Sequence, residues 1–255
     1  MSGTARRLIT FPPATYRSPT QRQLLGEAAP RIPFPIHLVE HDHGLVLFDA
    51  GLDPDHVGRP GDAYGELAER IDIDFREEHL IEVGLERLGY TPADVDTVVA
   101  SHLHFDHAGG LKRFPHARTY VGAGEREYAN APERYCAAWF REDDHGDHLG
   151  IRWHEVDDDR DVLGDGAVRI LFLPGHTPGS LALRVRLPDR TVVLSGDVVH
   201  ARADLEAERS YPLDVDSLTA RASLRRLQRC CVGAELWIAH DPDDWERFGG
   251  AGELR

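Results

Sequence analysis

The chain has 255 residues, of which 41% are hydrophobic and 29% charged, a composition typical of a globular protein with a sizeable core. Its formal net charge of −15 argues against nucleic acid or an anionic membrane as a partner, because both are polyanions. No segment reads as a signal peptide or a membrane span. The three cysteines, Cys136, Cys230 and Cys231, do not form a disulfide framework. We therefore expect a cytoplasmic protein with reduced thiols.

The N-terminal residues 1–34 are expected to form an irregular arm, because five prolines interrupt any regular element there. A single domain then spans residues 35–255. It begins with two strand-like runs, residues 35–39 and 44–49, separated by a short polar turn. This pattern predicts a β-hairpin.

The next part of the chain alternates between helical and strand-like patterns. Residues 58–65 are expected to be a loop, and residues 77–88 have helical periodicity that ends before Gly89. A buried strand is predicted over residues 95–100 and a further strand over 118–121, followed by a short helix near Glu125.

The acidic, histidine-rich stretch 141–148 is expected to be a solvated surface loop, with a mobile flap near a site as the alternative. Beyond it we predict one helix, residues 217–228 capped by Asp216, and a series of strands. The strands are residues 151–156, 168–173, 181–185, 191–194 and 236–239. Strands interrupted by a few helices predict an α/β protein with mixed sheets.

Three imidazoles and a carboxylate lie within six residues at the end of the 95–100 strand, as His102, His104, Asp106 and His107. Imidazole and carboxylate are the ligands of zinc and similar divalent ions. If the strand continues, the first two histidines project to the same side. Since glycines then turn the chain, one set of ligands can face one metal and the next set a neighbouring metal.

Three further strand ends each carry a histidine or an aspartate beside small residues, namely His176, Asp197 and His240. Strand ends are where site residues commonly lie on a rigid scaffold. A single histidine in such a place is usually structural. Seven residues of this kind from four strand ends instead predict one metal site.

Taken together, these seven residues, in this order, resemble the metallo-β-lactamase superfamily. The segments 101–110, 174–179 and 239–241 are most similar to the N-acyl-homoserine lactonases, and the resemblance extends from about residue 35 to 245. It implies an αββα sandwich of two mixed β-sheets flanked by helices. It also implies two divalent metal ions, expected to be Zn²⁺. The first would be held by His102, His104 and His176, the second by Asp106, His107 and His240, with Asp197 bridging.

The chemistry that the resemblance implies is the opening of a lactone ring, in N-acyl-homoserine lactones of the quorum-quenching type. A hydroxide bridging the metals would attack the carbonyl, and Asp106 would carry a proton to the leaving oxygen. Asp49, which ends a strand near the site, is the candidate for orienting an imidazole. Phe105 could wall the pocket or pack beneath it.

One residue departs from the lactonase pattern. Many lactonases of this family have a tyrosine three residues after the bridging aspartate, where this chain has His200. We expect His200 to act on the substrate in its place, since an imidazole can also donate a proton or a hydrogen bond. The alternative is that its side chain points elsewhere.

Several alternatives stay open beside the lactonase prediction. The histidine at position 200 also resembles organophosphate hydrolases of the superfamily, so hydrolysis of phosphotriesters or other esters is the enzymatic rival. Thioesterase and β-lactamase activities fit the motifs less well. The non-enzymatic alternative is a metal-containing binding or sensor protein. The expected partner is a small lactone or ester, and the N-terminal arm could also support a homodimer.

Overall fold

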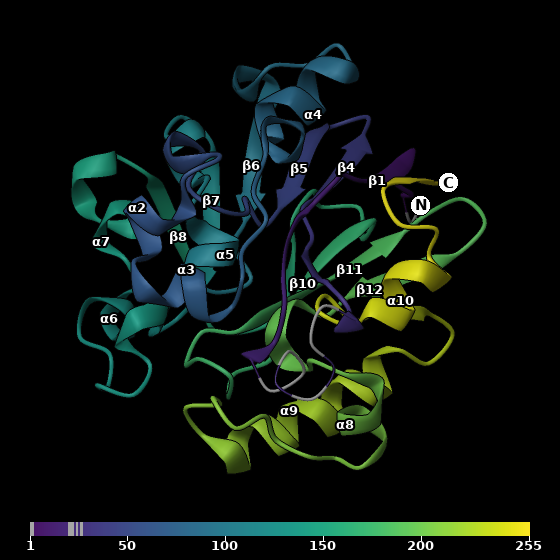
Figure 1. Cartoon of the computed structure of the whole chain (residues 1–255). Coiled ribbons are helices and arrows are strands. Elements are labelled where there is room, and N and C mark those ends of the chain that lie inside the picture. Colours follow the sequence, from purple (N-terminus) through teal and green to yellow (C-terminus); the bar gives the residue numbers. More distant parts are fainter. Residues whose placement is uncertain (1–2, 20–22, 24, 26–27) are drawn as a thin grey trace.

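Two β-sheets packed face to face, with helices on both outer sides, make up the computed structural model (Figure 1), which describes all residues except 1–2, 20–22, 24 and 26–27. The strands are β1 (Arg7–Thr10), β2 (Ala14–Tyr16), β3 (Ile32–Phe34), β4 (His37–His41), β5 (Gly44–Phe48), β6 (Val95–Val99), β7 (Arg118–Gly122), β8 (Arg152–Val156), β9 (Arg160–Asp161), β10 (Val168–Phe172), β11 (Leu181–Arg186), β12 (Thr191–Leu194), β13 (Glu235–Trp237) and β14 (Gly252–Leu254).

The helices are short, apart from the one that covers the second sheet. They are α2 (Pro60–Tyr64), α3 (Glu66–Arg70), α4 (Ile81–Arg87), α5 (Phe105–Ala108), α6 (Glu125–Asn130), α7 (Glu142–His145), α8 (Arg202–Glu206), α9 (Ser217–Cys230) and α10 (Pro242–Arg247). The predicted cap of α9 is confirmed, because the Asp216 side chain accepts hydrogen bonds from the backbone N–H groups of Leu218 and Thr219.

The first sheet has seven strands in the order β14-β1-β4-β5-β6-β7-β8. The predicted hairpin is confirmed as the antiparallel pair β4 and β5, and β5 to β8 pair in parallel. The prediction of an irregular segment before residue 34 is wrong for β1, which pairs with both β4 and β14. It is also wrong for β2 and β3, which form a separate two-stranded sheet. The part of this prediction that concerns residues 1–2, 20–22, 24 and 26–27 lies outside the described residues.

The second sheet has five strands in the order β13-β12-β11-β10-β9. The pairs β9–β10, β10–β11 and β11–β12 are antiparallel, whereas the pair β12–β13 is parallel. Strands β10, β12 and β13 therefore run in one direction, and their carboxyl ends meet at one edge of the sheet. The N–H of Leu181 donates to the carbonyl of Ser101 (2.8 Å), which joins this edge to the end of β6 in the first sheet.

Alternation along the strands decides which side chains fill each layer. In β5, Val46 faces the second sheet while Leu47 faces the helices that cover the first. In β12, Val192 lies between the sheets and Val193 packs towards Leu224 of α9. Three apolar layers result, one between the sheets and one under the helices on each side. The predicted α/β sandwich is confirmed.

Two segments that look like loops in the sequence are helical. The predicted loop 58–65 contains α2, because proline is well tolerated in the first turn of a helix and Pro60 is the first residue of α2. The stretch predicted to be a solvated loop forms α7, in which Asp144 and His145 are buried. Arg141 donates to Asp144 (2.7 Å) and to Asp53 (3.2 Å), which offsets part of the cost of burying these carboxylates. Burial still outweighs the ion pair at Asp144 and raises its pKa to about 7. The α7 helix packs against α5, which carries two of the predicted metal ligands.

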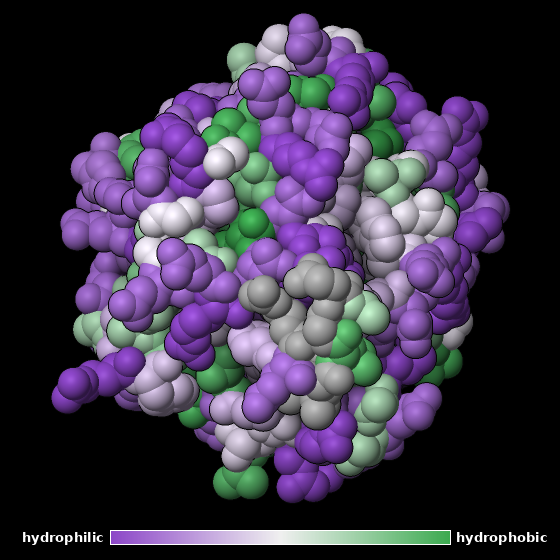
Figure 2. All heavy atoms as spheres, viewed as in Figure 1, coloured by the Kyte–Doolittle hydropathy of each residue, from purple (hydrophilic) through white to green (hydrophobic). Residues whose placement is uncertain are grey.

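The surface is largely hydrophilic on the face shown in Figure 2, where apolar side chains are scattered between charged ones. No helix within the described residues is long and apolar enough to cross a membrane. All three cysteines are free thiols, as predicted.

Candidate metal centre

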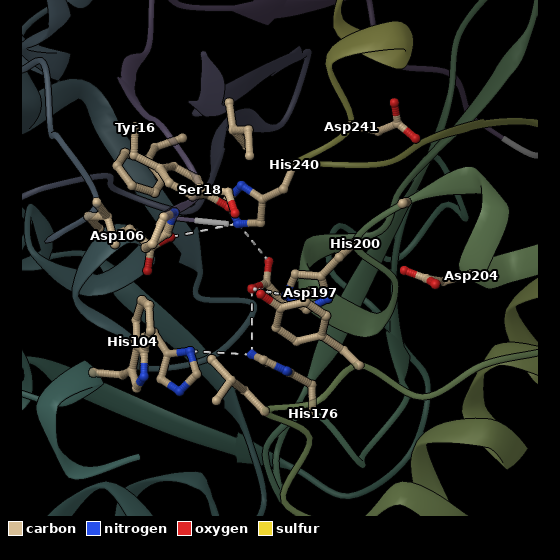
Figure 3. Close-up of a pocket in the computed structure, with 18 of the residues that line it drawn as sticks. Tyr16, Ser18, His104, Asp106, His176, Asp197, His200, Asp204, His240 and Asp241 are labelled. Atoms are coloured by element: carbon tan, nitrogen blue, oxygen red, sulfur yellow. Dashed lines mark hydrogen bonds and ion pairs between the residues drawn. The ribbon is translucent and has the colours of Figure 1, made fainter. Parts of the chain in front are cut away.

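The seven histidine and aspartate residues predicted from the strand ends come together at one edge of the sandwich. They form two clusters. The first group contains His102, His104, His176 and Asp197, and the second group contains Asp106, His107 and His240. All seven side chains are buried. Figure 3 shows how several of them point toward one another from different elements.

Asp197 lies between the two groups. Its Oδ2 is 3.5 Å from Nε2 of His176 and 3.7 Å from Nε2 of His102, both in the first group. Its Oδ1 is 3.0 Å from Nε2 of His240 and 3.2 Å from Nε2 of His107, both in the second group. One carboxylate therefore presents a separate oxygen to each group, which is the arrangement that the resemblance implied for a bridging ligand.

Hydrogen bonds on the outer side of the histidines determine which nitrogen faces inward. The Nδ1 of His107 lies 2.9 Å from Asp49 Oδ2, and that of His176 lies 3.0 Å from Asp214 Oδ1. The Nδ1 of His240 lies 2.8 Å from the carbonyl oxygen of Pro33. Because these oxygens only accept hydrogen bonds, we assign the proton of each neutral ring to Nδ1. Each Nε2 then turns an unprotonated lone pair toward the other ligands.

Several of these inward-facing atoms are placed where a cation would satisfy them. The Nε2 atoms of His107 and His240 lie 3.3 Å apart, and nearby carboxylates, Asp106 and Asp197 among them, raise the pKa of both rings against the effect of burial, so the pair shares a proton when no metal ion is bound. Asp197 Oδ1 and His102 Nε2 are buried without a hydrogen bond to any described residue. Asp197 Oδ1 lies near two imidazoles, but neither contact has hydrogen-bond geometry. The donor set therefore fits divalent metal ions.

The electrostatics of the centre favour the ligating forms of several groups. Burial, together with the neighbouring imidazoles, lowers the pKa of His102 and His104 well below the usual value, which keeps both rings neutral. Burial alone would raise the pKa of Asp197, but His240 and His107 outweigh it and hold that pKa well below its usual range. Neutral imidazoles and an ionised carboxylate are the protonation states that bind a metal.

Asp49 orients the second group, as predicted. Its Oδ2 accepts from His107, and its Oδ1 accepts from the N–H of Ser101 (2.7 Å). Its φ of 62° lies in the left-handed region, which is uncommon for a residue with a side chain. The two hydrogen bonds explain why this strained conformation is retained beside the site.

Two residues that contact the centre were not found from the sequence. Asp214 orients His176 from the loop before α9, and Glu125 accepts hydrogen bonds from two backbone segments that carry ligands. Neither lies in a motif. Asp214 has no local pattern around it, and Glu125 had been noted only as a marker of a short helix.

Close packing around the bridging carboxylate requires a glycine. Gly196 has a φ of 51°, and a Cβ at this position would lie 2.7 Å from Ser101 Cβ and 2.8 Å from the carbonyl oxygen of Leu181. The absence of a side chain at Gly196 therefore leaves room for close packing beside Asp197.

His200 lies at the centre and does not point elsewhere. Its Nε2 is 3.1 Å from Asp197 Oδ2, and its ring stacks on Tyr211 with centroids 3.7 Å apart. Its Nδ1 is buried and has no hydrogen-bond partner in the described part of the chain. Burial lowers the pKa of His200, which favours the neutral ring. The neutral ring donates from Nε2 to Asp197 and keeps Nδ1 as an acceptor.

A pocket of about 690 Å³ opens above the two groups. Its floor contains Asp106, His176, Asp197, His200 and His240, and its walls are rich in apolar side chains. The apolar and aromatic wall residues are Tyr16, Ile32, Phe34, Leu67, Ile71, Tyr135, Trp139, Tyr211 and Leu213. Phe105 is not among them; it is fully buried and stacks beneath Trp139, with ring centroids 5.7 Å apart. Of the two alternatives for Phe105, packing beneath the pocket is the one observed.

A third cluster, His41, His43 and Asp165, lies in a different part of the protein and fits a metal poorly. His41 Nδ1 accepts from the N–H of His43 (3.1 Å), so the ring proton is on Nε2, which lies 3.0 Å from Asp165. Both nitrogens of His41 are therefore already occupied by hydrogen bonds.

Comparison with known proteins assigns the fold to a family. A family model described as the metallo-beta-lactamase superfamily matches residues 35–230. The chain belongs to this superfamily. The N-acyl homoserine lactonase AttM of Azorhizobium caulinodans is 34% identical over 226 residues, with 85% of both chains covered. The N-acyl homoserine lactonase of Bacillus cereus is 29% identical over 214 residues, with 82% of both chains covered.

A solved structure of an N-acyl homoserine lactone hydrolase has the product N-hexanoyl-L-homoserine bound at its catalytic metal centre. It is 25% identical to this chain and superposes with a TM-score of 0.82, covering 96% of this chain and 97% of that one. The predicted relationship to the superfamily, and within it to the lactonases, is confirmed. The chain is accordingly a metal-dependent hydrolase of the metallo-beta-lactamase superfamily.

Proposed function

We propose that this protein is a lactonase that opens the ester ring of N-acyl-homoserine lactones. The observation that carries the proposal is Asp197, whose two oxygens face two groups of metal ligands on the floor of an apolar-walled pocket. Curated relatives of the chain are named N-acyl homoserine lactonases, which supports the choice of substrate.

The two groups would hold two divalent ions, and Zn²⁺ suits their imidazole and carboxylate ligands. His102, His104 and His176 would bind one ion, Asp106, His107 and His240 the other, and Asp197 both. Bound there, the ions would supply Lewis-acid polarisation of the ester carbonyl and would acidify water.

Asp106 is the residue of the second group best placed to move a proton. It lines the pocket, and its Oδ2 lies 3.4 Å from His107 Nε2 and 3.6 Å from His240 Nε2. In ring opening, water adds across the ester bond: its oxygen becomes part of the carboxylate, and one proton must reach the departing ring oxygen. Asp106 takes up that proton and delivers it.

The walls of the pocket suit a substrate with an apolar acyl chain. Leu67 lies in α3 and Ile71 directly follows it. Trp139 lies between α6 and α7, and Phe34 comes from β3. A pocket of about 690 Å³ lies within the range of ~300–1,000 Å³ that is usual for small-molecule sites. Burying a methylene contributes about 0.8 kcal/mol, so an acyl chain adds binding free energy along these walls.

The proposed function is tested by a substrate panel with the zinc-loaded protein. We expect turnover of N-acyl-homoserine lactones to exceed that of phosphotriesters, thioesters and β-lactams. The metal content of the same preparation is measured, and Asp106→Asn serves as the inactive control. A metal-loaded protein without turnover of any ester or lactone would instead indicate the binding or sensor function.

His200→Ala is expected to lower kcat/KM for lactones by about 10–100-fold without reducing the metal content, because the ring both lines the pocket and donates to Asp197. Steady-state kinetics and elemental analysis check this expectation. His116→Ala, which removes an exposed imidazole, is the matched control. Unchanged lactone kinetics in His200→Ala, alongside an inactive Asp106→Asn, would show that His200 does not serve the reaction.

A second candidate function is the hydrolysis of phosphotriesters or other esters at the same centre. The observation that favours it is His200 itself, since the shorter imidazole stands where many lactonases have tyrosine. In the substrate panel, this function predicts that phosphotriesters turn over faster than lactones.

Under either function the partner is a small molecule. We also propose a cytoplasmic location, and the oligomeric state to be measured is a monomer or a homodimer.

A further inference from the structure

A carboxylate outside the ligand set connects two of the segments that hold the first group. Glu125 is the first residue of α6 and is fully buried. Its Oε1 accepts a hydrogen bond from the N–H of Leu103 (2.9 Å), and its Oε2 accepts one from the N–H of Gly179 (2.9 Å). The two donors are 76 positions apart in the sequence, and no local pattern predicts that one side chain joins them.

The two bonded segments carry all three histidines of the first group. Leu103 lies between His102 and His104, and Gly179 lies in the turn that follows His176. The ligands of the second group lie elsewhere: Asp106 and His107 belong to α5, and His240 follows β13.

The contact between the segments is tight. A Cβ on Gly179 would lie 2.5 Å from Glu125 Cβ and 2.5 Å from the carbonyl oxygen of Gly122. A residue with a side chain therefore does not fit at position 179, and glycine lets the backbone approach the Glu125 carboxylate. Burial raises the pKa of Glu125, and hydrogen bonds from Thr177, Leu103 and Gly179 act in the opposite direction.

The second group has its own carboxylate in the corresponding role. Asp49 accepts from His107 through Oδ2 and from the N–H of Ser101 through Oδ1. Asp49, after β5, therefore contacts a ligand of the second group directly, whereas Glu125, after β7, supports the first group through its backbone.

We propose that Glu125 is a positioning residue that sets the metal affinity of the first group selectively. The inference rests on the proposed function only in that the first and second groups each bind a metal. Glu125 acts through the backbone, by holding the His102–His104 segment and the His176 turn at a constant separation.

The amide variant Glu125→Gln is the sharpest test, because it keeps the size of the side chain and changes one acceptor into a donor. Glutamine can accept from one of the two N–H groups, but its NH₂ group then faces the other, which is left without an acceptor. Glu127→Gln is the matched control: it makes the same chemical change in the same helix, at an exposed position.

The measurement is a titration of the metal-free, full-length protein with Co²⁺, followed by its visible absorption and repeated in competition with a chelator. His104→Ala and His240→Ala assign the binding steps, since each removes a ligand from one group only. We expect Glu125→Gln to weaken the step lost in His104→Ala by about 10–100-fold and to leave the step lost in His240→Ala unchanged. Asp49→Asn, which alters the hydrogen bond to His107, should weaken the step lost in His240→Ala.

Equal weakening of both steps in Glu125→Gln, or behaviour like that of Glu127→Gln, would overturn the inference. If circular dichroism shows that Glu125→Gln does not fold, Glu125→Asp decides, because it keeps both acceptors and only withdraws them by one methylene; the same step must weaken. A wild-type protein that binds no Co²⁺ in defined steps would contradict the proposed function itself, together with this inference.

Discussion

Asp197→Asn is expected to bind at most one metal ion and to lose more than about 100-fold in kcat/KM for lactones. The wild-type carboxylate presents Oδ1 to His240 and His107 and Oδ2 to His176. An amide retains one oxygen and turns an NH₂ group toward the other side, where it opposes a metal ion. Loss of a shared ligand should exceed the ~10–100-fold effect typical of losing a residue that only orients a ligand.

Elemental analysis and lactone kinetics on the same samples test this expectation. Asp189→Asn is the matched control, because Asp189 is exposed and forms a surface ion pair with Arg190. Full metal content in Asp197→Asn would contradict the bridging role. Circular dichroism distinguishes loss of metal from loss of fold.

The second large effect is expected in Asp106→Asn, which should lower kcat by about 10²–10⁴-fold, the usual contribution of a positioned acid or base. The asparagine can still offer an oxygen to the second group but cannot carry a proton. In the wild-type protein, burial alone would raise the pKa of Asp106, but His107 and His240 outweigh burial and lower this pKa. The Asp106 carboxylate is therefore ionised and can accept a proton. The loss should appear in kcat more than in KM.

Pre-steady-state and steady-state lactone kinetics measure this loss. Asp96→Asn is the matched control, because Asp96 is an exposed residue of β6. If Asp106→Asn loses metal in proportion to its activity, the residue acts as a ligand alone and the proton is carried by another group. Activity near the wild-type level would exclude both roles.

The ligands could be predicted from the sequence because their chemistry is concentrated there. Four of the seven lie within six residues, and Asp197 and His240 each follow an apolar strand. The number of such residues at strand ends predicts one site. That these ends lie at one edge follows from β10, β12 and β13 running in one direction, which only the structure shows. Which nitrogen of each histidine faces the centre could not be predicted, because it depends on hydrogen-bond partners far along the chain, such as Asp214 for His176 and Pro33 for His240.

The errors have a common physical origin in how tertiary contacts override local signals. β1 was missed because Arg7 and the flanking prolines make a four-residue strand look irregular, yet it pairs on both sides. Asp144 is expected at the surface because charged residues usually lie there; in the structure it is buried, where it pairs with Arg141 and burial raises its pKa to about 7. Glu125 was overlooked because a hydrogen bond to a distant backbone leaves no periodic trace.

The N-terminal segment holds one further consequence. Pro33 supplies the oxygen that orients His240, and Tyr16 and Phe34 form part of the pocket wall. These residues lie before residue 35, where the match to the superfamily begins. The segment before the matched residues thus contributes to both the metal centre and the pocket wall, and the rest of the wall, including Leu67, Trp139 and Tyr211, lies within the match. Because one segment supports a metal ligand and lines the pocket, a change in its path would couple metal binding to substrate fit.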